Sequence, residues 1–332
     1  MNYQRTDFRP PDHRMTGFSL VEVMVALAIG LVLTLGVVTL TLNTNRTHAE
    51  LSQASMQIDN GRTAMQILSS EIQLAGFYGE FYDSITPPGT LLDPCHTHLH
   101  QLRDSMGLPL QGYDGATDTI PPCVVNAGHI AGTDVLVVRR TMTVETDPAS
   151  LVSGGIYLQG APLEWVLDGG TASNFALVDR DGNLIPIRRY RADMYFIGTN
   201  DQGDPALRRL EVNEFSSSPT AVTLVDGIEN MQIDYGIDRN ADGAPDSSSD
   251  TANDAYVGRP ADVDAWLNVV SLRVHLLTRN LEPTPGHSDD KTYRLGLTAA
   301  NATQTVGPEN DAFKRHVYQS TVRLANISGR RE

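Results

Sequence analysis

The longest apolar stretch of the chain covers residues 18–42 and contains a single charged side chain, Glu22. A helix that crosses a membrane needs about 20 apolar residues, whereas the apolar core of a cleaved signal has about 7–15. The stretch therefore predicts one membrane-spanning helix. Basic residues precede it, among them Arg5, Arg9 and Arg14, and few follow it. This asymmetry predicts a cytoplasmic N-terminus and places the rest of the chain beyond the inner membrane, in the periplasm.

A helical pattern of apolar and polar positions continues beyond this stretch. Over residues 51–75, apolar or small side chains recur at steps of three and four, which defines one face of a helix. The face consists of Leu51, Ala54, Ile58, Gly61, Met65, Leu68, Ile72 and Ala75. Residues 43–76 are therefore predicted to form an amphipathic continuation of the same helix, which ends at Gly76. A coiled-coil stalk is the alternative, but the remainder of the chain offers this face another surface to pack on.

Residues 77–332 are expected to form a β-rich head. Residues 77–130 are rich in proline and are predicted to be mostly loop. Beyond them, alternation between apolar and polar positions predicts short strands. The expected strands cover residues 134–140, 156–159, 175–179, 184–190, 207–212, 231–237, 270–276 and 318–324, with a hairpin turn at residues 180–183. No second long helix is indicated, so the predicted fold class is α+β: a long N-terminal spine helix packed on an antiparallel β-rich globular head.

The charge and the motifs of the chain limit its functions. The formal net charge is −15, and a surface of this sign repels the phosphates of nucleic acids, so no nucleic-acid partner is expected. The sequence contains no Gly-x-Ser-x-Gly, no His-Glu-x-x-His and no phosphate-binding glycine-rich motif. The chain is therefore not expected to be an enzyme.

The chain has two cysteines, Cys95 and Cys123. On the chain-entropy model, a disulfide that closes a loop of this size stabilises a protein by about 3–4 kcal/mol, in a compartment that is oxidising. His96, His98 and His100 follow Cys95 and would share one face of an extended segment. Their spacing matches no standard zinc site, so a disulfide is the favoured role of Cys95.

An acidic loop in the second half of the chain has the beginning of a calcium-binding pattern. Its loop positions 1, 3, 5, 7 and 9 are Asp238, Asn240, Asp242, Ala244 and Asp246. Side-chain oxygens, with a backbone carbonyl at position 7, are the ligands that Ca²⁺ prefers. Position 12 is Ser249 in place of glutamate, and no helices are predicted to flank the loop, so it is not an EF-hand. A bound Ca²⁺ and an acidic turn solvated by water both remain open.

The six residues Gly17-Phe18-Ser19-Leu20-Val21-Glu22 closely resemble the leader junction of type IV prepilins. The resemblance implies that residues 1–17 are a leader, that a prepilin peptidase cuts between Gly17 and Phe18, and that Phe18 is then N-methylated. It also implies a pilin fold, and that Glu22 pairs with the N-terminal ammonium of a neighbouring subunit during assembly. Physical reasoning agrees, because a carboxylate in an apolar helix with no partner of its own favours one in another chain.

Within this class, the chain resembles the PilW-like minor pilins in its large size and in residues 267–279 and 313–326. This resemblance implies a role in initiating type IV pilus assembly, in a tip complex with other minor pilins and the major pilin. A tip adhesin, twitching motility and cell adhesion belong to the same expectation. Two alternatives stay open at this point: a large pseudopilin of a type II secretion system, and a membrane-anchored binding domain that never joins a filament.

Overall fold

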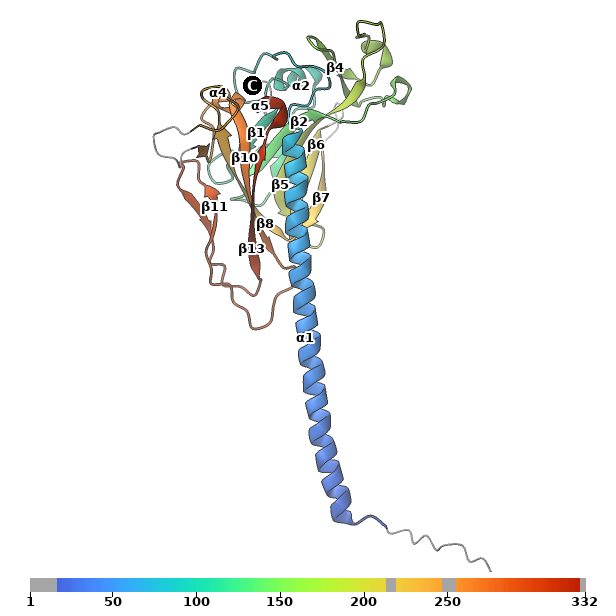
Figure 1. The fold of residues 1–332 in the computed structure, drawn as a ribbon, viewed down its shortest axis with the longest axis vertical. Coiled ribbons are helices and arrows are strands. Elements are labelled where there is room, and N and C mark those ends of the chain that lie inside the picture. The colour runs from blue at the N-terminus through green and yellow to red at the C-terminus, as the bar shows by residue number, and fades with distance from the viewer. Residues whose placement is uncertain (1–16, 213–218, 247–254, 329–332) are drawn as a thin grey trace, which may run out of the picture. The chain divides into compact units, whose positions relative to one another are not determined.

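The computed structural model describes residues 17–212, 219–246 and 255–328, and these residues form an α+β protein. One long helix, α1 (Leu20–Gln73), precedes an antiparallel β-rich head, as Figure 1 shows. The chain divides into two units, Met1–Ser52 and Gln53–Glu332. The last part of α1, from Gln53 onwards, therefore belongs to the same unit as the strands. The predicted fold class is confirmed.

Short helices complete the head. They are α2 (Leu99–Ser105), α3 (Pro122–Asn126), α4 (Val263–Leu267) and α5 (Ala325–Ser328), with 3₁₀ turns at Pro148–Ser150 and Ala172–Asn174. Asp262 caps α4, because its side chain accepts a hydrogen bond from the Ala265 backbone N–H.

The first sheet has seven strands. The order is β1 (Leu110–Tyr113), β2 (Val135–Thr141), β5 (Ile187–Thr199), β3 (Ile156–Gly160) and β4 (Trp165–Gly169), while β6 (Pro205–Val212) pairs with β5 and β7 (Thr220–Asp226) pairs with β6. Strand β5 is 13 residues long. Its first residues pair with β3, and the rest pair with β2 and β6. One strand therefore holds the two arms of the sheet together.

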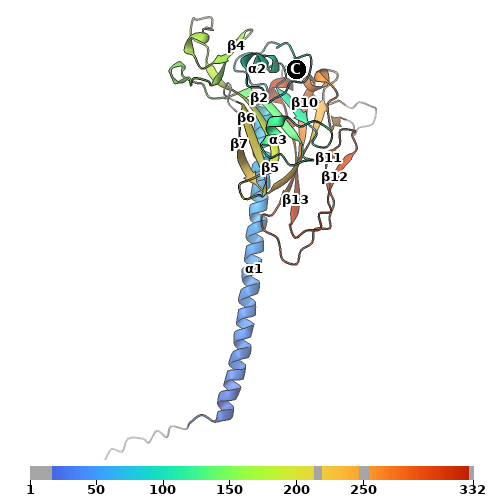
Figure 2. The same ribbon diagram turned by 180° about the vertical axis from the view of Figure 1, so that it is seen from behind.

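Both faces of this sheet are covered, which is visible in β2. Leu136 and Val138 belong to a core shared with α1, whereas Val135 and Val137 belong to a second core that includes Val124 of α3. Figures 1 and 2, seen from opposite sides, show α1 over one face and α3 over the other. Every residue of β2 is buried. Because both faces of the strand are covered, its sequence does not alternate between apolar and polar residues.

The second sheet has four strands, in the order β13 (Arg315–Arg323), β10 (Val269–Arg279), β8 (Ile228–Ile237) and β9 (Tyr256–Val257). A separate hairpin is formed by β11 (Tyr293–Leu297) and β12 (Thr303–Val306). Alternate residues of β8 and β10, such as Ile233 and Val274, enter the core shared with α1. This core joins the two sheets to the head-side part of the helix.

The face that α1 turns to the head differs in part from the predicted stripe. Its buried residues are Gln57, Gly61, Ala64, Leu68 and Ile72. The prediction holds from Gly61 onwards, but Leu51, Ala54 and Ile58 are exposed. Gln57 is buried in place of Ile58, because its side-chain amide donates hydrogen bonds to the carbonyl oxygens of Thr278 (3.0 Å) and Lys314 (2.9 Å). A polar group that is fully hydrogen-bonded can be buried at little cost.

Two strand predictions need correction. Residues 175–179 form no strand, and only one isolated bridge joins Val178 to Leu184. The turn at residues 180–183 is present, because the Asp179 carboxylate accepts hydrogen bonds from the backbone N–H groups of Asp181 and Asn183. Strand β5 begins at Ile187, three residues later than expected. The segment 77–130, predicted as loop, contains α2, β1 and α3.

Candidate functional site

The prepilin-like junction lies at the beginning of the described chain. Gly17, Phe18 and Ser19 precede the helix, which begins at Leu20 and not at Phe18 as predicted. Phe18 is 82% exposed. The rest of the predicted leader, residues 1–16, lies outside the described residues. The two sides of the Gly17–Phe18 bond are thus in non-helical backbone.

Glu22 lies in the first turn of α1 and is exposed. The partial positive charge at a helix N-terminus favours a carboxylate there. Among the described residues, no hydrogen-bond donor or cation reaches its side chain. The carboxylate is therefore available to a group outside this chain.

The part of α1 that follows Glu22 has an apolar and exposed surface. Leu31, Val32 and Leu33 are each about two-thirds exposed, and α1 is the one described helix that is long and apolar enough to cross a membrane. The hydroxyl groups of Thr34, Thr39, Thr41, Thr44 and Thr47 each donate to the carbonyl oxygen four residues earlier, at 2.7–3.0 Å. These polar groups therefore need no partner from the surroundings, as an apolar environment requires.

Polar side-chain contacts hold the part of α1 from Gln53 onwards against the strands. The Asn60 amide donates to the Asp226 carbonyl oxygen at 3.0 Å, and Glu71 forms an ion pair with Arg140 at 2.7 Å. Gly61 lies against Tyr318 of β13, where a Cβ atom would overlap the tyrosine ring. The position and rotation of this part of the helix are therefore fixed by polar groups and by one glycine, in addition to apolar packing.

A disulfide joins Cys95 and Cys123, with 5.7 Å between the Cα atoms. The loop that it closes contains α2 and β1, so it connects the proline-rich segment to α3. His98 and His100 stack on each other with ring centroids 6.2 Å apart, and α2 begins between them at Leu99. The histidines therefore do not lie on one face of an extended segment, and no group of metal ligands was found among the described residues.

The acidic loop after β8 turns its oxygen atoms towards its own backbone. The Asp238 carboxylate accepts hydrogen bonds from the N–H groups of Ala241 (2.6 Å) and Gly243 (3.0 Å). Asp246 accepts from the N–H groups of Arg239 and Asn240. Ala241 and Gly243 have positive φ angles of 65° and 80°, which makes this tight arrangement possible. The loop is closed by its own donors.

This geometry does not assemble the predicted calcium ligands. Asp242 accepts a hydrogen bond from the Ala244 N–H, and the Asn240 amide donates to Asp246. Position 12 of the pattern, Ser249, lies outside the described residues. Ca²⁺ would have to exchange these hydrogen bonds for metal contacts, so calcium stays a prediction. Calorimetry of the full chain with Ca²⁺, beside the double variant Asp238→Ala with Asp242→Ala, would test it.

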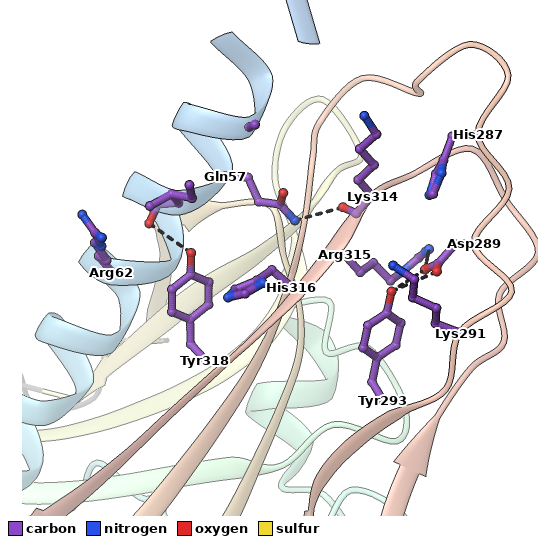
Figure 3. A pocket seen from close by; sticks show the side chains of 12 residues that line it. Gln57, Arg62, His287, Asp289, Lys291, Tyr293, Lys314, Arg315, His316 and Tyr318 are labelled. Atoms are coloured by element: carbon purple, nitrogen blue, oxygen red, sulfur yellow. Dashed lines mark hydrogen bonds and ion pairs between the residues drawn. The ribbon is translucent and has the colours of Figure 1, made fainter. Parts of the chain in front are cut away.

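A buried arginine, Arg315, lies beside Asp289 and Tyr293, as Figure 3 shows. Arg315, the first residue of β13, donates to Asp289 (2.9 Å), Asp311 (2.7 Å) and Glu229 (2.9 Å). The side chains of Arg315 and Asp289 are each 1% exposed. Tyr293 donates a further hydrogen bond to Asp289 at 2.9 Å. Sequence reasoning missed this cluster, because its members come from three distant segments.

The cluster changes the protonation of its carboxyl groups. Burial acts to raise the pKa of Asp289, but hydrogen bonds from Arg315 and Tyr293 outweigh it and lower this pKa. The hydrogen bond from Arg315 is the main cause that lowers the pKa of Asp311 to about 2. Both groups are therefore charged at neutral pH, and the positive charge of Arg315 is shared among its carboxylate partners.

Two family models match the chain. The model described as the prokaryotic N-terminal methylation motif matches residues 12–38, and the model described as type IV pilus-assembly protein W matches residues 194–326. No curated protein and no solved structure matches. The first match covers Gly17, Phe18 and Glu22, and the second extends from β5 to α5.

The methylation motif and the long apolar helix before a β-rich head define a type IV pilin. More particularly, the pilus-assembly match over residues 194–326 and the methylation motif together support a PilW-like type IV pilin.

Proposed function

We propose that the chain is a minor pilin that helps to initiate type IV pilus assembly, in a priming complex with other minor pilins and the major pilin. The observation that carries the proposal is the methylation motif at the start of an apolar helix whose carboxylate, Glu22, has no partner among the described residues. The PilW match over residues 194–326 favours a pilus over the other uses of such a helix.

The mechanism is one of processing and transfer. A prepilin peptidase removes the leader after Gly17, and Phe18 becomes the N-methylated first residue. The apolar part of α1 is then moved from the inner membrane into the core of a filament, where contacts with other subunits replace contacts with lipid. Glu22 attracts the N-terminal ammonium of a neighbour, because an apolar surrounding strengthens the interaction between opposite charges.

The proposed location follows from the same mechanism. The N-terminus lies in the cytoplasm, the helix in the inner membrane, and the head in the periplasm until the subunit enters the pilus. The disulfide between Cys95 and Cys123 agrees with an oxidising compartment. A tip adhesin is a further proposed partner, and the proposal includes no catalytic step and no nucleic-acid partner.

The first test is the N-terminus of the mature protein. Sequencing of the processed chain is expected to begin at Phe18. A mature chain that begins elsewhere would contradict the assignment of the junction and with it the proposed assembly route.

The second test separates the proposal from its rivals. Glu22→Ala is expected to abolish piliation while the protein remains present in the membrane, whereas an anchored binding domain outside any filament would keep its function. Loss of protein secretion with piliation intact would instead identify a pseudopilin of a type II secretion system. Co-purification with pilins of the same cell would identify the neighbours.

A further inference from the structure

Strand β7 forms one edge of the first sheet, because it pairs with β6 and with no other strand among the described residues. Figures 1 and 2 show it at the margin of the head from opposite sides. Its sequence, Thr-Ala-Val-Thr-Leu-Val-Asp, includes no proline and no basic side chain, and the one charged residue is the last. The side chains of Thr220 and Val222 are exposed, that of Val222 to 46%. The outer side of this strand, away from β6, is the β7 edge.

The backbone of the β7 edge is open. Within residues 17–212, 219–246 and 255–328, β7 exchanges backbone hydrogen bonds with β6 alone. The N–H and C=O groups of a strand point alternately to its two sides, so about half of those in β7 point away from β6. At the end of the strand, the Asp226 carbonyl oxygen accepts a hydrogen bond from the Asn60 amide at 3.0 Å. Residues 220–225 therefore offer donors and acceptors that the described part of the head does not use.

The other edges of the two sheets are protected. At β4, the Arg103 side chain donates two hydrogen bonds to the Leu167 carbonyl oxygen, at 2.8 and 3.0 Å. Strand β1 lies against the second sheet, where a Cβ atom at Gly112 would overlap the Tyr235 hydroxyl group. Strand β9 has two residues, and β13 begins with the buried charge of Arg315. Covered edges, short strands and inward-pointing charges all prevent pairing between edges, and the β7 edge has none of these three features.

The β7 edge is held in place by the rest of the sheet. Strand β6 pairs with β5 along its whole length. The β6–β7 ladder has one register shift, between Leu207 and Arg208, and residues 220–223 of β7 pair regularly beyond it. The Asn200 amide donates to the Asp226 carboxylate at 2.8 Å and fixes the end of the strand. A partner strand therefore meets a preformed template, and little ordering of this chain opposes its binding.

We propose that the β7 edge pairs with an extended segment of a neighbouring pilin of different sequence, which adds a further strand to the first sheet. The inference rests on the proposed function, since the proposed priming complex brings other pilins beside this chain. The chemistry of the edge selects such an occupant, because alternating N–H and C=O groups are matched along their length by another extended backbone.

The position of the edge supports a subunit of the same assembly as the source of this segment. The β7 edge is continuous with α1 through the hydrogen bond between Asn60 and Asp226. The proposed function places α1 against other pilins, so a pilin that packs on this helix has the edge within reach. A β-branched or aromatic residue of the added strand would pack beside Val222, since such residues form favourable cross-strand pairs.

Hydrogen exchange tests the backbone pairing directly. The full chain is purified alone in detergent and, separately, as the complex that co-purifies with other pilins. Amide exchange in residues 220–226, followed by mass spectrometry, is expected to be about tenfold slower in the complex, because a paired strand protects its amides. Strand β2, in which every residue is buried, is the internal control. Its exchange should be the same in the two preparations.

A single cysteine identifies the partner. Both natural cysteines are joined in the disulfide, so Val222→Cys introduces the one free thiol of the chain. After labelling with a photoreactive maleimide and irradiation in native membranes, this thiol is expected to be joined to a peptide of another pilin. Val152→Cys is the matched control, because Val152 is 51% exposed and lies outside the strands. It should not capture the same peptide.

A charged residue on the edge is expected to prevent the pairing. Lysine is tolerated on an open edge strand but opposes the addition of a further strand. In Val222→Lys, the protection of residues 220–226 should be lost, while thermal unfolding of the chain stays unchanged. Val152→Lys should retain the protection. If Val222→Lys does not fold, the exchange and cysteine measurements still decide the question.

The remaining outcomes overturn the inference. If the chain co-purifies with other pilins but β7 exchanges equally in both preparations, the edge proposal fails and the proposed function stands. Capture of a pilin peptide without protection of β7 would show side-chain contact without strand pairing, and would also reject the proposal. Capture of a second copy of this chain would assign the edge to self-association and reject a different pilin. If the chain associates with no pilin, the proposed function fails, and with it the edge proposal.

Discussion

In residues 20–52 of α1, apolar side chains such as Leu31 are exposed, whereas in residues 53–73 even the polar Gln57 is buried. The first segment has its hydroxyl groups satisfied within the helix and leaves Glu22 without a partner among the described residues. The second segment uses Gln57, Asn60 and Glu71 for directional contacts with the strands. An exposed apolar surface indicates a partner outside the chain, and a buried polar side chain indicates a partner within it.

This contrast makes the two segments respond differently to substitution. Changes in the head and in the part of α1 packed on it are expected to alter the free energy of unfolding of the head. Changes in the exposed apolar segment are expected to alter assembly and leave the head unaffected.

The largest effect is expected for Arg315→Met, which breaks the polar packing of the head. The substitution leaves the buried Asp289 without its cation, and removal of one partner from a buried ion pair costs about 3–5 kcal/mol. Chemical denaturation of the full chain in detergent would measure the loss. Arg180→Met, on an exposed turn, should change the unfolding free energy by less than about 0.5 kcal/mol. Equal effects for the two variants would contradict the role assigned to Arg315.

The same cluster predicts a dependence of stability on acid. The pKa of Asp311 is lowered to about 2, and that of Asp289 is also lowered. A carboxyl group with a depressed folded-state pKa stabilises the fold fully above its unfolded value of about 3.9, and this contribution is lost as the pH falls towards 2. The head is therefore expected to lose stability between about pH 4 and pH 2. Denaturation curves over this range should depend less on pH in Arg315→Met than in the unmodified chain.

A smaller effect is expected for Gln57→Leu. The Thr278 and Lys314 carbonyl oxygens would lose their donor, and a buried group left unsatisfied costs about 1–3 kcal/mol. Gln66→Leu is the matched control, because Gln66 is an exposed glutamine on the same part of the helix. If Gln57→Leu stabilised the head, the hydrogen bonds would not be the reason for the burial of Gln57.

Glycine substitutions compare the two segments of α1 directly. Gly61→Leu is expected to cost about 1 kcal/mol, because the new side chain must displace Tyr318, which is half-buried and can partly move away. A Cβ atom at Gly36 meets no atom within 4 Å, so thermal unfolding of the head in Gly36→Leu should be the same as in the unmodified chain. A similar loss in both variants would mean that the glycines act through the helix alone.

The smallest effect on the head is expected for Glu22→Gln. Glu22 forms no hydrogen bond or ion pair with the described residues, so the free energy of unfolding should change by less than about 0.5 kcal/mol. Pilus assembly should nevertheless be lost, because glutamine keeps the size of the side chain and removes the charge. Electron microscopy and surface-shear assays of pili would provide the measurement, and normal piliation would show that the charge is dispensable.

Much of the fold was predictable because its strongest signals are local. The uninterrupted apolar residues at the start of α1 and the alternation in β8 and β10 lie within single segments. The strand at 175–179 was predicted wrongly, although the turn at 180–183 was predicted correctly. The turn is stabilised by hydrogen bonds to the Asp179 side chain and by one isolated bridge, so it needs no strand before it. The burial of Gln57 was not predicted, because the pattern of apolar residues does not show which strand carbonyl oxygens lie opposite an amide side chain.

The junction residues could be found from sequence, because Gly17, Phe18 and Glu22 are contiguous. The cluster around Arg315 could not, since Arg315, Asp289 and Glu229 come from segments that are distant in the sequence. The calcium prediction for the acidic loop stays open: its ligand types match a pattern, and the hydrogen bonds from backbone N–H groups to Asp238 could not be inferred from that pattern.

The threonine hydroxyl groups of α1 form their hydrogen bonds within the helix itself, and this affects how easily the helix can change its surroundings. These residues are Thr34, Thr39, Thr41, Thr44 and Thr47. When a helix of this kind leaves a bilayer for a bundle of other helices, its apolar side chains exchange one set of dispersion contacts for another, and its hydroxyl groups carry their hydrogen bonds with them. No hydroxyl has to find a new acceptor on the way in or on the way back. In the proposed filament, entry and withdrawal of this segment would therefore require little rearrangement of hydrogen bonds.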